Sequence, residues 1–332
     1  MLTATGAGTV GESANSSHNA AKASGVMSAT QGEALMGEAS TGADRYRSVF
    51  RPGLFAGRVI VVTGGGSGIG RCTAHELASL GATVALVGRK PEKLSAVVAE
   101  ITEDGGQAAA YPCDIRQEEA VAAMVAAILQ AHGRVDGLVN NAGGQFAAPL
   151  ASISQKGWET VVRTNLTGGF LMARECFTQW MRAHGGAIVN IVADMWQGMP
   201  TMGHSGAARA GMVNFTETAA GEWSAAGVRV NAVAPGWIAS SGMDHYPPEM
   251  GEHIRAMKDK VPLGRLGTES EVSAAIVFLL SEGAGFISGA TLRVDGAVPN
   301  NKVGYQLPPN PNPAPVYEGF HRAVAPKVLR EE

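Results

Sequence analysis

The feature of this sequence that most limits its fold is the alternation of short apolar segments with longer helical segments. Strands that alternate with helices pair in parallel, and near-continuous apolar runs are typical of parallel strands that are covered on both faces. The sequence therefore predicts a single α/β domain with a doubly wound, Rossmann-type parallel sheet. The strand segments are expected at 59–62, 82–87, 136–139, 187–192, 228–233 and 291–294.

The same alternation indicates where a ligand should bind. In open parallel sheets, ligands bind beyond the carboxyl ends of the strands. Functional residues are therefore expected in five segments that follow strands, namely 63–70, 88–90, 140–144, 193–196 and 235–241.

The two ends of the chain differ from the region between them. Residues 1–44 are rich in small and hydroxyl residues and poor in residues that fill a core, so a disordered leader is expected. The domain is then expected over residues 45–297, with a Pro-rich C-terminal tail over 298–332. The segment 307–315 cannot continue a helix or a central strand, and the sequence leaves open whether this tail packs or stays free.

Charge and composition exclude several classes of function. A net charge of −3 gives no electrostatic reason to expect a nucleic acid or an anionic membrane as partner. The sequence has neither a secretory signal nor an apolar run long enough to cross a membrane. Cys72, Cys113 and Cys176 lack the spacing of disulfides or zinc ligands, so no metal is expected. We expect a cytoplasmic protein that acts on a small molecule.

A glycine-rich segment, TGGGSGIG at 63–70, follows the first predicted strand and opens a helix. Gly64 permits a tight turn, Gly68 lets the backbone approach a pyrophosphate, and Gly70 allows close helix packing. The N-terminus of the helix offers free N–H donors to the anion. This context favours a dinucleotide site over a plain turn. The predicted contacts are Gly64, Ser67, Gly68, Ile69 and Gly70.

Two basic residues at the end of the second predicted strand indicate which cofactor is bound. NAD-binding proteins usually carry an acidic residue there, whereas this sequence has Arg89 and Lys90. Arg89 can bind a 2′-phosphate with a fork of donors, and Lys90 adds a point charge. The sequence therefore predicts NADP(H). The alternative is that both residues merely begin a solvated helix.

Several motifs together resemble the short-chain dehydrogenase/reductase superfamily across the folded region. They are the glycine-rich segment, Cys113-Asp114-Ile115, Asn140-Asn141-Ala142-Gly143, Asn165, Pro235-Gly236 and Val294-Asp295-Gly296. The resemblance implies that Asp114, with Ile115, contacts adenine and that Asn141, Ala142 and Gly143 line the cofactor cleft. It also implies that Ile238 holds the nicotinamide carboxamide beside Pro235 and Gly236, with a hydrogen bond from Ser240. A homotetramer is expected on the same ground.

The catalytic positions depart from the superfamily pattern. Most members carry Tyr-x-x-x-Lys on the helix after the fifth strand, but here Ser205 and Arg209 stand at those positions. Asp194 follows that strand in place of the usual Ser pair, and Asn165 is retained. Carbonyl reduction leaves an alkoxide that needs an acid, and Ser is too weak an acid for that role. The predicted catalytic residues are Asn165, Ser205, Arg209 and Asp194.

These residues suit the reduction of a double bond conjugated to a thioester. Charge then gathers on an enolate oxygen, which hydrogen-bond donors such as Ser205 and Asn165 can hold, while Arg209 grips the nicotinamide ribose. Further motifs are similar to peroxisomal trans-2-enoyl-CoA reductases, a family that uses NADPH. Those motifs are Gly143-Gly-Gln-Phe146, Lys156-Gly-Trp158, Thr164-Asn-Leu-Thr-Gly168, His184-Gly-Gly186 and His204-Ser-Gly-Ala-Ala-Arg-Ala-Gly211. The sequence thus predicts an NADPH-dependent reductase of a trans-2-enoyl-CoA thioester.

Alternatives remain at the level of both residue and function. Val213 stands where the enoyl-CoA reductases have a Tyr, so the proton donor is unassigned, and His204 or Tyr246 could supply it. Asp194 could pair with Arg209 or cap the next turn. The sequence also resembles bacterial dehydrogenases linked to acyclic terpene (citronellol-type) breakdown. A non-catalytic NADP(H) sensor or scaffold is the third alternative. Residues expected either in an acyl pocket or in the core are Met195, Trp196, Met199 and Met202.

Overall fold

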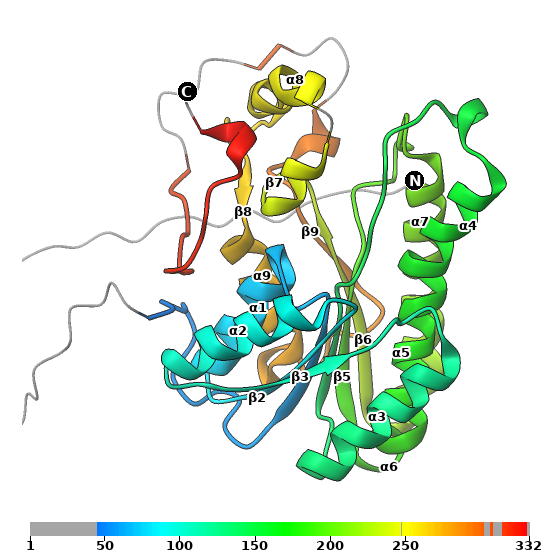
Figure 1. Cartoon of the computed structure of the whole chain (residues 1–332), viewed down its shortest axis with the longest axis vertical. Coiled ribbons are helices and arrows are strands. Elements are labelled where there is room, and N and C mark those ends of the chain that lie inside the picture. The colour runs from blue at the N-terminus through cyan, green and yellow to red at the C-terminus, as the bar shows by residue number, and fades with distance from the viewer. Residues whose placement is uncertain (1–44, 247, 302–305, 308–313, 331–332) are drawn as a thin grey trace, which may run out of the picture. The chain divides into compact units, whose positions relative to one another are not determined.

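The computed structural model describes residues 45–246, 248–301, 306–307 and 314–330, so the predicted disorder of 1–44 lies outside the described residues. The described residues form a seven-stranded sheet of order β3-β2-β1-β4-β5-β6-β9, in which every pairing is parallel (Figure 1). The predicted fold class is confirmed. The strands are β1 Val59–Thr63, β2 Thr83–Gly88, β3 Gln107–Pro112, β4 Gly137–Asn140, β5 Gly186–Ile191, β6 Val228–Pro235 and β9 Thr291–Val294.

Strand β3 was absent from the strands predicted by sequence. Its residues, QAAAYP, lack the β-branched side chains that mark the other strands, and none of them is fully buried because β3 forms an edge of the sheet. Pairing with β2 from Thr83↔Gln107 to Gly88↔Pro112 holds it in place. Backbone hydrogen bonding, rather than side-chain preference, therefore decides this strand.

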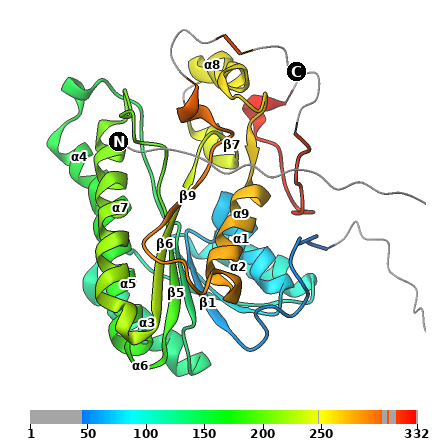
Figure 2. The same cartoon turned by 180° about the vertical axis from the view of Figure 1, so that it is seen from behind.

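Helices cover both faces of the sheet, as Figures 1 and 2 show from opposite sides. The helices α1 Gly68–Ser79, α2 Pro91–Glu103 and α9 Glu269–Leu280 pack on one face. The helices α3 Glu118–His132, α5 Gly168–Cys176 and α7 Gly203–Trp223 pack on the other. The shorter elements are α4 Gln155–Val162, α6 Arg182–His184, β7 Ile238–Ala239, α8 Gly251–Ala256 and β8 Gly267–Thr268.

The central strands are mostly apolar because both of their faces are buried, with buried polar exceptions such as Asn190 in β5 and Asn231 in β6. In β2, Val84 and Leu86 face the core beneath α1 and α2, whereas Ala85 and Val87 face the core beneath α3. Fully burying an aliphatic side chain of this kind contributes roughly 1.5–3 kcal/mol to folding. This burial explains the continuous runs that predicted a doubly wound sheet.

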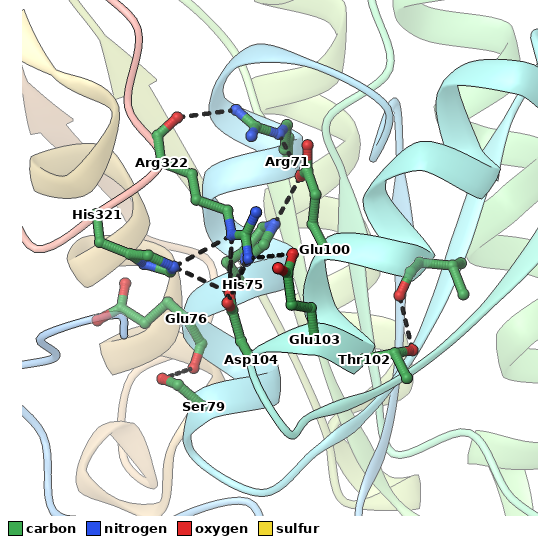
Figure 3. Close-up of polar contacts among 11 residues, drawn as sticks. Arg71, His75, Glu76, Ser79, Glu100, Thr102, Glu103, Asp104, His321 and Arg322 are labelled. Carbon is green, nitrogen blue, oxygen red and sulfur yellow. Dashed lines mark hydrogen bonds and ion pairs between the residues drawn. The ribbon is translucent and has the colours of Figure 1, made fainter. Parts of the chain in front are cut away.

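The C-terminal tail packs on the domain, a point that the sequence left open. Phe320 is 3% exposed, and its ring packs at a tilt against the rings of Tyr46 and His75. Figure 3 shows Arg322 and His321 converging on Asp104 at the end of α2, where Arg322 Nη2 lies 2.7 Å from Asp104 Oδ1. Burial disfavours the charge on Asp104, but bonds from Arg322 and His321 outweigh it and lower the pKa of this carboxyl.

The far end of the tail reaches the segment that follows β7. Val328 N donates to Asp244 Oδ1 over 3.3 Å, and Arg255 Nη1 on α8 donates to Val328 O over 3.2 Å. The tail thus connects helices α1 and α2 with residues 241–256, which follow β7 at the carboxyl edge of the sheet. Figure 1 shows this red segment running between the two regions.

Within the described part of the chain, no helix combines the length and the apolar character that a membrane span needs. The same residues contain no group of three or more His, Cys, Asp or Glu side chains placed to hold a metal ion.

Candidate functional site

The glycine-rich loop between β1 and α1 leaves no room for a side chain at Gly64 or Gly70. A Cβ at Gly64 would lie 2.8 Å from Asn141 Nδ2, and one at Gly70 would meet both Asn141 Nδ2 and Gly64 O. Gly64 and Gly68 have φ values of +66° and +58°, a region that favours glycine. Ser67 precedes α1 without a side-chain cap, so the first N–H groups of this helix face the loop. This cradle suits the pyrophosphate of a dinucleotide.

A second loop, at the end of β4, is tied to the first by Thr63. Thr63 Oγ1 accepts the N–H groups of Asn141 and Ala142, each over 2.9 Å, and donates to Val139 O over 3.2 Å. Asn141 Nδ2 returns a bond to Thr63 O over 3.0 Å. The predicted residues Asn141 and Ala142 therefore lie directly beside the glycine-rich loop.

Basic residues gather where the adenosine end of a dinucleotide would lie. Arg89 and Lys90 follow β2 and are exposed. Asp114, predicted to contact adenine, is held by Arg116, whose Nη2 lies 2.5 Å from Asp114 Oδ2. The hydrogen bond from Arg116 is the main cause of the lowered pKa of Asp114, to which the nearby charge of Arg89 also contributes. Arg116 was not singled out by the sequence, because an Arg in a loop carries no motif.

Arg209 reaches from α7 beneath the β4 loop. Its Nη1 donates to Ile191 O at the end of β5 over 2.6 Å, and its Nε is buried without a partner. A Cβ at Gly143 would lie 2.5 Å from Arg209 Nη2, so glycine is needed there. Desolvation lowers the pKa of Arg209 to about 10, because no carboxylate offsets it. A buried cation with a spare donor is suited to hold ribose hydroxyls.

Asn165 lies in a π-helical turn, 163–167, between α4 and α5, and is 3% exposed. Its Oδ1 accepts the N–H of Gly144 over 2.9 Å, and its Nδ2 donates to Gly144 O over 3.0 Å. Single turns of π-helix occur often at functional sites. The predicted donation from Asn165 to substrate competes with this clamp, so the clear role of Asn165 is to fix the loop 143–146.

Ser205 joins a chain of hydrogen bonds that the sequence did not predict. Ser205 Oγ, fully buried in the first turn of α7, donates to Gln145 Oε1 over 2.8 Å. Gln145 Nε2 donates to Tyr246 Oη over 3.0 Å. Gln145 belongs to the loop that Asn165 clamps. The structure thus brings together residues from three separate segments.

His204, at the start of α7, is fully buried. Its Nδ1 accepts the N–H of Ser205 over 2.9 Å, which leaves the proton on Nε2. That Nε2 is buried without a partner, and the ring lies edge-on to Phe146 with centroids 4.4 Å apart. Packing therefore accounts for most of its surroundings, and the predicted relay role stays a prediction.

Asp194 faces the end of β9 rather than Arg209. Burial is the main cause of its raised pKa and the charge of Asp295 adds to it, whereas Arg293 and the N–H of Trp196 oppose the shift. The bond to the N–H two residues ahead is the turn-capping alternative that the sequence offered. Trp196 is 46% exposed, with the Arg293 guanidinium 5.7 Å from its ring centre.

The remaining predicted residues follow β6. Gly236 N donates to Val294 O over 2.9 Å, and a Cβ at this position would lie 2.7 Å from Asp295 Cα. Ile238 is buried in β7. Pro235 ends β6, and Ser240 precedes the turn 241–245. These residues line the carboxyl edge of the sheet, as the sequence predicted.

Glu269, at the start of α9, is a site residue that the sequence missed. Its Oε1 lies 3.8 Å from the position of a Cβ on Gly68, so the carboxyl faces the glycine-rich loop. Burial raises the pKa of Glu269 to about 7, against the opposing effects of Arg71 and the N–H of Ser241. No motif links residue 269 to residue 68, since tertiary packing alone places α9 beside α1.

These features together fit a dinucleotide with a reactive nicotinamide. The glycine cradle and the α1 N-terminus suit a pyrophosphate, while the buried, partly unpaired Arg209 suits sugar hydroxyls. The arrangement can hold a nicotinamide cofactor at the carboxyl edge of the sheet.

Comparison with known proteins identifies the family of this chain. Residues 64–298 match the family model described as enoyl-(acyl carrier protein) reductase. The chain belongs to the short-chain dehydrogenase/reductase family.

Three relatives illustrate the range of the family. A Bacillus subtilis protein named "Probable 2,4-dienoyl-CoA reductase [(2E)-enoyl-CoA-producing]" is 36% identical over 242 residues, 72% of this chain and 95% of its own. A solved structure of the citronellol catabolism dehydrogenase AtuB from Pseudomonas aeruginosa PAO1 is 64% identical, with a TM-score of 0.70 over 76% of this chain and 99% of that one. A Beutenbergia cavernae structure with bound NADP is 35% identical, with a TM-score of 0.70 over 76% of this chain and 100% of that one.

Proposed function

We propose that this protein is an NADPH-dependent reductase of the double bond in a 2-enoyl-CoA thioester. The observation that carries the proposal is the replacement of the family's Tyr and Lys by Ser205 and Arg209. Ser205 already donates its hydroxyl proton to Gln145, and Arg209 is bound to Ile191 O, so neither replaces the Tyr as the acid. A conjugated thioester places its negative charge on an enolate, which needs hydrogen-bond donors more than a strong acid. The likeness to a dienoyl-CoA reductase supports this choice.

The cofactor preference rests on Arg89 and Lys90. Both are exposed at the end of β2, where a 2′-phosphate would lie. Bound NADPH supplies a hydride to the substrate. Within this proposal the protein works in the cytoplasm as a homotetramer.

A second candidate is an NAD(P)-dependent dehydrogenase of an acyclic terpenoid alcohol or aldehyde. The observation that favours it is the 64% identity to a dehydrogenase of citronellol catabolism. The two candidates share one cofactor site and differ in the group that is reduced.

The absorbance of NADPH at about 340 nm separates these functions. Purified protein is offered a straight-chain trans-2-enoyl-CoA, geranyl-CoA, or citronellal with NADPH, and in parallel citronellol with NADP+. Oxidation of NADPH that depends on a conjugated thioester supports the first candidate. Turnover of citronellol and citronellal alone contradicts it and supports the second. Tight NADPH binding without turnover of any substrate indicates a sensor.

A further inference from the structure

The reaction needs a proton donor, and the superfamily's usual donor is missing from α7. Ser205 at that position is fully buried, and its proton is committed to Gln145 Oε1. Desolvation leaves Arg209 with a pKa of about 10, and its Nη1 is bound to Ile191 O. Asp194 is bound to the N–H of Trp196 and faces Asp295 and Arg293. Ser205 and Asp194 are thus engaged within the protein, and the spare donor of the buried Arg209 suits the ribose hydroxyls of the cofactor.

Tyr246 has the geometry that these groups lack. Its hydroxyl accepts a hydrogen bond from Gln145 Nε2 over 3.0 Å, so its own proton remains available to a substrate. Tyr246 is half-buried and follows the turn 241–245 at the carboxyl edge of the sheet, and Gln145 is exposed beside it. The pair therefore lies where a substrate can reach it.

We propose that Tyr246 is the proton donor of this enzyme and that Gln145 and Ser205 position it. This inference rests on the proposed function. Reduction adds a hydride, supplied by NADPH, to Cβ of the enoyl thioester and creates an enolate. The O–H bond of Tyr246 then breaks as a C–H bond forms at Cα, and solvent later reprotonates the phenolate. The N–H of Gln145 stabilises that phenolate, as a nearby cation does for the family's usual Tyr.

Two parts of the fold keep the donor in place. Asn165 clamps the backbone of Gly144 with a pair of bonds, which orients Gln145. The C-terminal tail holds the turn before Tyr246, because Val328 N donates to Asp244 Oδ1. The Asn165 clamp thus fixes the Gln145 side of the Gln145–Tyr246 pair, and the C-terminal tail fixes the Tyr246 side.

The test compares Tyr246→Phe with Tyr111→Phe. The control removes the same atom from a tyrosine whose hydroxyl bonds His132 and no residue of the candidate site. The reaction is run with NADPH and trans-2-enoyl-CoA in deuterated water, and the configuration of deuterium at Cα is read by NMR. Wild type and Tyr111→Phe should incorporate deuterium on one face. Tyr246→Phe should lose about 100-fold in kcat. It should also give both configurations, because water then protonates the free enolate.

The positioning roles of Gln145 and Ser205 are tested by the kcat and KM of separate variants. Gln145→Glu keeps the acceptor for Ser205 but removes the N–H that faces Tyr246, so kcat should fall about 10-fold with KM nearly unchanged. Ser205→Ala should also lower kcat with little change in KM, but by a smaller factor than Gln145→Glu. A Tyr246→Phe enzyme that keeps both kcat and one configuration at Cα overturns the assignment and leaves the proposed function intact.

The substrates that wild type turns over test the proposed function, whereas the kcat of Tyr246→Phe tests the proton donor. If wild type oxidises NADPH with none of the thioesters, the proposed function fails. If that wild type turns over citronellol, the kcat of Tyr246→Phe on the alcohol still decides whether Tyr246 is the acid or base. If no substrate turns over while NADPH binds, both proposals are wrong.

Discussion

The cofactor-binding and substrate-binding parts of the site are built in different ways. The cofactor part uses the backbone of short motifs at the ends of β1 and β4, which Thr63 ties together, and the basic side chains that follow β2. The substrate part uses side chains from distant segments, such as Ser205, Gln145 and Tyr246. This chain therefore carries the family's glycine-rich motif, whereas the residues that we propose for proton transfer lie outside the family's usual Tyr and Lys positions.

The largest effect is expected from loosening the C-terminal tail. This change tests whether the tail supports the substrate-binding part of the site. Phe320→Ala should destabilise the protein by about 3–5 kcal/mol, because Phe320 is 3% exposed and packs against Tyr46, His75 and Arg71. Thermal unfolding measures the loss. At a temperature low enough for Phe320→Ala to stay folded, its kcat should fall by a larger factor than its affinity for NADPH. The control Val324→Ala, in the same tail but 62% exposed, should change little. An unchanged kcat would show that the tail only stabilises the fold.

The next effect concerns the cofactor part alone. Gly70→Ala places a Cβ against Gly64 O and Asn141 Nδ2, and overpacking of this kind costs about 1–3 kcal/mol. NADPH affinity, measured by fluorescence titration, should fall at least about 10-fold. Gly221→Ala in α7 is the matched control, since nothing lies within 4 Å of its added Cβ. Equal losses in both variants would contradict the proposed cradle.

Cofactor preference should depend on one side chain. Arg89→Ala should weaken NADPH binding about 10-fold and leave NADH binding unchanged, because only NADPH carries the 2′-phosphate. The exposed Lys258, on the turn after α8, supplies a control that removes the same charge elsewhere. Parallel loss of both cofactors would show that Arg89 does not read the phosphate.

The smallest effect is a pH dependence within the cofactor part. The pKa of Glu269 is raised to about 7, so the carboxyl is neutral below that pH and charged above it. The charged form faces the glycine-rich loop and should repel the pyrophosphate. NADPH affinity should therefore fall several-fold as pH rises from about 6 to 8, as Coulomb repulsion near a partly buried site predicts. Glu269→Gln should remove this slope, and Glu282→Gln, on an exposed carboxylate, should keep it.

Glu269 also makes the free energy of unfolding depend on pH. Because the folded pKa of Glu269 lies above its ordinary value of 4.5, its contribution favours the folded state below about pH 4.5. That contribution is lost as pH rises through about 7. Denaturant unfolding of wild type and Glu269→Gln across this range measures the difference.

The sequence determined the fold class and the shape of the loop between β1 and α1. Apolar runs covered on both faces, glycines with positive φ at positions 64 and 68, and an uncapped helix start are local properties, so neighbouring residues in the chain suffice to predict them. Strand β3 escaped prediction because its Ala-rich residues carry no local signal.

Only the tertiary structure revealed the contacts among Ser205, Gln145 and Tyr246 and the packing of the C-terminal tail. Gln145 lies 60 residues from Ser205 and 101 residues from Tyr246, so no spacing in the sequence records their contact. Arg322 likewise meets Asp104 across 218 residues. Side-chain hydrogen bonds of this kind form only after the sheet has brought the ends of its strands to one edge. The sequence therefore showed that the usual acid was missing and offered His204 and Tyr246 as candidates, and the contacts of the fold are the basis on which we propose Tyr246.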